Sequence, residues 1–145
     1  MSSPTRFPYL QRGTGNGPHD LVPFLPAVLS RGGINVSVLG LVDSGSSFSV
    51  LPYDVGNRFG LDWNHLPHGL TLAGPAGGRP AKVLAVDLTF GPFGPLSQLF
   101  AWSSANDTPV LFGQITFFLN FDVFFCRAQS YCEIQPATTS SAATP

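Results

Sequence analysis

One aspartate in the chain stands where a carboxylate could do chemistry. Residues 41–52 read LVDSGSSFSVLP, so Asp43 ends an apolar run and is followed by glycine and small hydroxyl residues. A carboxylate in such a place can act as a general acid or base. The structural alternative is that Asp43 only caps a turn, because Asp-Ser-Gly sequences commonly do so. The rest of the chain has to decide between these two interpretations.

The histidines and cysteines offer less chemistry. His19, His65 and His68 fall in predicted loops without metal-ligand spacing or a nucleophile elbow, so we expect exposed loop residues, no metal and no other cofactor. Cys126 and Cys132 suit two reduced thiols on one hairpin, and a disulfide across that hairpin is the alternative.

The composition bounds the fold and the partners. A chain of 145 residues fits one domain, and 43% hydrophobic residues against 10% charged residues provide ample material for a core. The net charge is -1 and no Lys/Arg cluster interleaves with aromatic residues, which argues against a nucleic-acid partner. Such low charge density also suggests that neutral surface faces another chain, so we expect an oligomer.

The ends of the chain carry no targeting pattern. The first residues lack the apolar stretch of a signal peptide, and no window of about eighteen apolar residues follows, so a soluble cytoplasmic protein without a membrane partner is expected. We divide the chain into an N-terminal arm at residues 1–20, one domain at residues 21–135 and a disordered tail at residues 136–145.

Fourteen prolines and sixteen glycines cut the chain into short segments, a pattern that is typical of β structure. Residues 21–29 and 34–42 predict two strands joined by a turn at Arg31-Gly32-Gly33, and Asp43 ends the second strand. Further strands are predicted at residues 70–73, 82–90, 96–102, 121–126 and 131–134, and short helices at residues 54–61 and 114–119.

Three features in this order resemble the retropepsins, the aspartic proteases of retroviral type. Residues 41–46 (LVDSGS) are similar to the family's first signature, residues 110–113 (VLFG) are similar to its second, and a glycine-rich hairpin tip at residues 74–80 lies between them. The resemblance covers roughly residues 23–125, and residues 117–123 (FFLNFDV) are similar to bacterial members. It implies an all-β acid protease barrel with one or two short helices, acting as a homodimer with its active site on the two-fold axis.

The chemistry of that family accounts for the position of Asp43. Its members hydrolyse peptide bonds with two carboxylates that hold one water and share one proton, because two such close charges cannot both form. Only Asp43 carries the Asp-Ser-Gly motif; it is absent at Asp20, Asp54, Asp62, Asp87, Asp107 and Asp122. The resemblance therefore implies that each of two chains supplies one Asp43.

The resemblance also assigns roles to neighbouring residues. Ser44 would bond across the two-fold axis, Gly45 would let a peptide approach, and the hairpin tip would form a flap over the substrate. The implied substrate contacts are Ser46, Ser47, Leu72, Ala73, Gly74, Pro75, Ala76, Gly77, Gly78 and Leu111. The implied support of the Asp43 loop comes from Phe112, Gly113 and Gln114.

Two departures from the viral pattern are visible. Ser47 and Gln114 stand where viral members often carry an acid and an arginine that pair, so a plain hydrogen bond is expected there. The expected pocket walls are Leu72, Phe48, Val83 and Leu111, which predict apolar specificity pockets.

Other functions stay open. A retropepsin-like fold without activity could serve as a dimerisation or peptide-binding module, and the chain could also process its own ends. A phosphorylation-dependent degradation signal, which also begins with Asp-Ser-Gly, is disfavoured because Phe48 replaces the serine that usually closes it.

Overall fold

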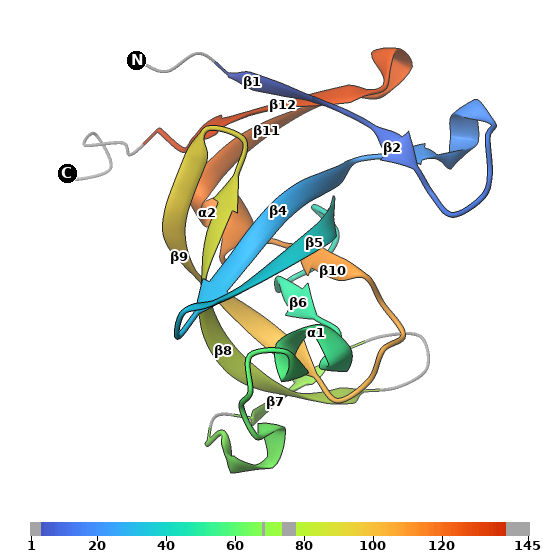
Figure 1. The fold of residues 1–145 in the computed structure, drawn as a ribbon. Helices are drawn as coiled ribbons and strands as arrows, with labels where there is room; N and C mark the ends of the chain where they lie inside the picture. The colour runs from blue at the N-terminus through green and yellow to red at the C-terminus, as the bar shows by residue number, and fades with distance from the viewer. Residues whose placement is uncertain (1–3, 68, 74–77, 139–145) are drawn as a thin grey trace.

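A computed structural model of the chain describes residues 4–67, 69–73 and 78–138 (Figure 1). The strands are β1 (Thr5–Pro8), β2 (Leu10–Gln11), β3 (Leu21–Val22), β4 (Phe24–Arg31), β5 (Ile34–Val42), β6 (Val50–Leu51), β7 (Gly69–Leu72), β8 (Arg79–Phe90), β9 (Phe93–Ser103), β10 (Val110–Phe112), β11 (Phe121–Cys126) and β12 (Tyr131–Pro136). The described α-helices are α1 (Tyr53–Asn57) and α2 (Phe117–Asn120), and single 3-10 turns lie at Pro18–Asp20, Trp63–His65 and Arg127–Gln129.

Six strands close into a barrel. They hydrogen-bond in the order β4-β5-β10-β6-β9-β8, and the pairing of β4 with β8 completes the ring. β7 adds to the far side of β8. Closure removes the unpaired edges that an open sheet would present. The predicted all-β barrel with short helices is thus confirmed at the level of architecture.

A second, three-stranded sheet joins the two ends of the described chain at the top of Figure 1. Its order is β1-β12-β11, with Thr5 opposite Ile134 and Phe121 opposite Pro136. β2 pairs separately with β3. β1, which lies in the expected N-terminal arm, is bound into a sheet with β12, and Pro136, the first residue of the expected tail, ends that strand. The rest of the expected tail lies, from residue 139 on, outside the described residues.

The turn between β4 and β5 follows from its sequence. Gly32 and Gly33 adopt φ of +58° and +80°, which suits a two-residue hairpin turn whose twist matches the strands. The register then places Arg31 opposite Ile34. The prediction of this hairpin, and of Asp43 directly after its second strand, is confirmed.

Both helices are shorter than the sequence indicates. α1 ends at Asn57, and the following turn contains Gly60 at φ +76°. α2 begins only at Phe117, because Ile115 is paired with Phe48 in an extended β-bridge and Gln114 is bound to the same loop. The predicted starts and ends are corrected accordingly.

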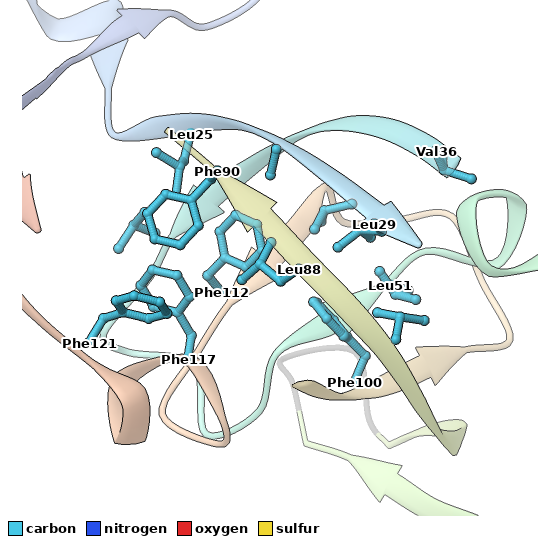
Figure 2. Close-up of a cluster of buried hydrophobic side chains, with 14 of the residues drawn as sticks. Leu25, Leu29, Val36, Leu51, Leu88, Phe90, Phe100, Phe112, Phe117 and Phe121 are labelled. Carbon is cyan, nitrogen blue, oxygen red and sulfur yellow. The ribbon is translucent and has the colours of Figure 1, made fainter. Parts of the chain in front are cut away.

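Phenylalanine rings pack against one another in the core that Figure 2 shows, beside leucine and valine side chains. The Phe117 ring lies 5.0 Å from those of Phe112 and Phe121, and the Phe121 ring lies 4.9 Å from that of Phe90, each measured between centroids. Such offset and edge contacts add to the hydrophobic gain of burial. Phe112 and Phe117 are fully buried, so the core holds one end of β10 directly.

Among the residues that the structure describes, no helix has the length and apolar character needed to span a membrane.

Candidate active site

Three barrel strands position Asp43. β5 ends at Val42, β10 runs parallel to it with Phe112 opposite Val42, and β6 pairs with the other side of β10 through Val50 and Leu111. The loop of residues 43–49 therefore leaves one neighbour of β10 and returns as the other. Asp43 is the first residue of this loop, which we call the Asp43 loop.

Backbone hydrogen bonds fix the Asp43 loop to the segment that follows β10. Asp43 N–H donates to the Phe112 carbonyl at 3.0 Å, and Gln114 N–H donates to the Ser46 carbonyl at 2.8 Å. Ile115 N–H donates to Ser47 at 3.1 Å, and its own carbonyl accepts from Ser49 N–H at 2.7 Å. The loop is thus held at both ends and in the middle.

Gly113 lets these two segments approach closely. A Cβ atom there would overlap the Phe48 backbone and lie 2.7 Å from the Ser46 carbonyl oxygen. The Gly113 N–H donates to Ser49 Oγ at 3.0 Å in a fully buried position. Ser49, which the sequence did not single out, therefore satisfies a buried donor under the loop. Its place five residues after the motif's Ser44 gave no signal of this role.

The Asp43 carboxylate is half-buried and held on one side. Its Oδ1 accepts the Gly45 N–H at 3.0 Å, and within the described chain Oδ2 has no hydrogen bond and the carboxylate has no ion pair. The first bond fixes the rotation of the side chain. The second oxygen is left for another group.

A cleft of about 550 Å³ opens beside the loop. The Asp43 loop, the β7–β8 hairpin and the loop before β10 line it, together with single residues of β6, β9 and β10. The lining residues are Gly45, Ser46, Ser47, Phe48, Val50, Thr71, Leu72, Ala73, Arg79, Ser103, Asp107, Thr108 and Leu111. Of the expected contacts, Gly45, Ser46, Ser47, Leu72, Ala73 and Leu111 are brought together there. Asp43 and Ser44 do not line the cleft themselves and directly precede Gly45.

The sequence predicted apolar pocket walls, but the wall of this cleft also carries two charged side chains. Arg79 Nε lies 2.7 Å from Asp107 Oδ2, so an ion pair spans from the β7–β8 hairpin to the loop before β10. Val83, expected in the wall, does not line the cleft. Nothing in the local sequence paired Arg79 with Asp107, although each adjoins a segment that the resemblance had marked.

The remaining predicted residues divide into three groups. Gln114 Nε2 donates to the Ser44 carbonyl at 2.7 Å, so its bond is with Ser44 and not with Ser47 as expected. Gly78 is exposed, does not line the cleft, and packs so closely on the Thr71 side chain that a Cβ would overlap it. The other flap positions Gly74, Pro75, Ala76 and Gly77 lie outside the described residues.

No cluster of three or more His, Cys, Asp or Glu side chains that could hold a metal occurs in the described part of the chain. His65 and His19 are exposed and lie near Asp62 and Asp20, at 2.7 Å and 3.5 Å. Both cysteines are free thiols, and burial raises the pKa of Cys132 to about 11. A buried thiol of this kind is inert at neutral pH.

Comparison with known proteins adds no assignment. No protein-family model matches the chain, and neither a curated protein nor a solved structure matches it significantly.

Proposed function

We propose that the chain is an aspartic endopeptidase of the retropepsin type, in which two copies of the chain each supply one Asp43. The two carboxylates would hold and activate a water molecule that attacks the peptide carbonyl. The proposal includes a homodimer, since a single chain offers one carboxylate of this kind.

One observation carries the proposal: Asp43 is fixed at the start of a loop that lines a cleft large enough for peptide side chains. The loop is bound by β10 and by the segment after it, and the Gly45 N–H orients the carboxylate. A turn that needed only a capping residue would not require a second segment threaded behind it. Such bracing instead suits a group that must keep its position during a reaction.

The division of labour between two carboxylates explains why one is not enough. Hydrolysis needs a base to take a proton from the water and an acid to give one to the departing nitrogen. Two close carboxylates fill both roles, because the pair retains one proton and titrates as a unit. In each Asp43, Oδ2 is the oxygen free for this work, as Oδ1 already accepts the Gly45 N–H.

The surface around the loop supports a contact with a second copy. Ser44 is exposed, and its hydroxyl makes no hydrogen bond within the described chain, so it is free to bond across a two-fold axis. Ile115, bound to the same loop, is an exposed large apolar side chain, and so are Leu99, whose N–H is bound to Thr116, and Leu119. Exposed apolar groups of this size commonly mark an interface.

The cleft indicates how a peptide would be held. Its floor is apolar at Phe48, Val50, Leu72 and Leu111, which suits apolar substrate side chains. β7 is the end strand of its sheet, so the hairpin that carries it offers backbone groups to an extended peptide.

The test compares the wild-type protein with Asp43→Asn on denatured casein between about pH 4 and 7, with and without pepstatin. We expect cleavage by the wild type, inhibition by pepstatin, and loss of cleavage in the variant. Asp87→Asn is the matched control, because Asp87 is an exposed carboxylate on β8 away from the cleft. Cleavage that survives in Asp43→Asn would reject the dyad. A wild type that binds peptides but cleaves none would favour the inactive binding module instead.

A further inference from the structure

The Arg79–Asp107 ion pair stands in the wall of the cleft at a place that can touch a substrate side chain. Arg79 is the first residue of β8, and Asp107 lies in the loop that leads into β10. The Pro80 carbonyl also accepts the Ser104 N–H at 3.1 Å, so the same two segments are tied by a backbone bond. The pair is therefore held on a fixed frame.

The Arg79–Asp107 ion pair is too exposed to contribute much to the stability of the fold. The Arg79 and Asp107 side chains remain 46% and 43% exposed, and an ion pair so open to water adds little to stability. Arg79 and Asp107 are nevertheless the charged residues among the described residues that line the cleft, so they determine its charge. Because each cancels the other at 2.7 Å, the wall as a whole carries no net charge.

We propose, on the basis of the peptidase function proposed above, that Arg79 and Asp107 together set the charge preference of one substrate subsite. With both present, this subsite takes an uncharged, mainly apolar side chain, which packs on Leu72 and Leu111. A substrate Glu or Lys gains nothing there, because the partner that would attract it is already paired and the other partner repels it.

When one member of the pair is removed, the other can bind a substrate side chain of opposite charge. Without Asp107, the Arg79 guanidinium is unpaired beside the apolar floor and attracts an acidic substrate side chain. Without Arg79, Asp107 attracts a basic one. Because both groups are partly exposed and screened by water, we expect each single substitution to change the Glu-to-Lys preference about 3- to 10-fold, in opposite directions.

The experiment uses peptides that are identical except for Glu, Gln, Leu or Lys at one position, with that position moved in turn along the peptide. Cleavage rates are measured with the wild type, Arg79→Gln and Asp107→Asn, and peptide affinities are measured in parallel with the same three proteins carrying Asp43→Asn. The wild type is expected to prefer Leu at one position. At that position Asp107→Asn should favour Glu, and Arg79→Gln should favour Lys.

The control is a second arginine ion pair among the described residues, Arg6 of β1 with Glu133 of β12, whose atoms lie 3.2 Å apart. Neither residue lines the cleft. Arg6→Gln and Glu133→Gln should leave the preference unchanged. If peptides are cleaved but the two cleft variants shift no preference, the inference fails while the peptidase stands. If none is cleaved but the affinities shift as described, the peptidase fails and the subsite stands. Absence of both cleavage and binding overturns the inference as well.

Discussion

Gly113 is the point where the Asp43 loop and the segment behind it come closest, and Gly113→Ala tests whether that closeness matters. The added Cβ would overlap the Phe48 backbone and lie 2.7 Å from the Ser46 carbonyl oxygen, whereas ordinary contact begins at 3.4 Å. One of the two segments must therefore move by more than about 0.7 Å, because the Phe48 backbone lies closer still than the Ser46 oxygen. Overpacking of this kind costs about 1–3 kcal/mol of unfolding free energy.

The effect on activity should exceed the effect on folding. Gly113 is adjacent to Phe112, whose carbonyl accepts the Asp43 N–H, so a shift there moves the carboxylate. Misplacement of a reacting group by about 1 Å can cost about 100-fold in rate, and we expect kcat/KM for a peptide to fall about 10- to 100-fold. The free energy of unfolding is read from urea denaturation, and kcat/KM from hydrolysis of the best peptide substrate under conditions where both proteins are folded.

Gly69→Ala is the matched control for this experiment. At Gly69 the nearest atom to an added Cβ is the Ala81 carbonyl oxygen at 3.8 Å, so the same substitution meets no obstacle. Its stability should change by less than about 1 kcal/mol, with activity near that of the wild type. A Gly113→Ala protein with wild-type stability and wild-type kcat/KM would refute the argument that close approach positions Asp43.

Three further changes have definite expected outcomes. Gln114→Leu removes the donor to the Ser44 carbonyl and should lower unfolding free energy by about 0.5–1.5 kcal/mol, as judged by urea denaturation; an unchanged midpoint would mean that this bond contributes nothing. Trp102→Ala empties a fully buried site and removes a bond to the Tyr53 carbonyl, so a loss of about 3–5 kcal/mol is expected, and a loss under 1 kcal/mol would contradict the described core. Because the folded pKa of Cys132, about 11, exceeds the ordinary 9.0, the folded state keeps its proton longer and stability should fall as pH rises from 9 to 11. Thermal melts in reducing buffer should show a smaller fall for Cys132→Ala, and an equal fall would exclude the thiol as a cause.

Local sequence was a good guide where structure is local. The turn at Gly32 and Gly33 and the position of Asp43 at a strand end follow from turn chemistry and from apolar patterning, and both were predicted correctly. The contacts of the Asp43 loop with Phe112 and Gly113 could be expected only because two separate short signatures were interpreted together.

Long-range pairing set the limits of that prediction. The partnership of β1 with β12 joins opposite ends of the described chain, and nothing in Thr5–Pro8 specifies it. The Arg79–Asp107 pair likewise depends on how the β8–β9 hairpin and the following loop fold back. The late start of α2 arises because the tertiary pairing of Ile115 with Phe48 overrides local helix preference.

Mixed dimers test directly whether one active site needs Asp43 from two chains. Wild-type and Asp43→Asn chains are unfolded together, refolded at a fixed total concentration in varied ratio, and assayed for peptide cleavage. If both carboxylates are required, activity follows the square of the wild-type fraction, so an equal mixture keeps about one quarter of full activity. Activity that falls in direct proportion to the wild-type fraction would show that each chain works alone, and would contradict a site shared by two chains.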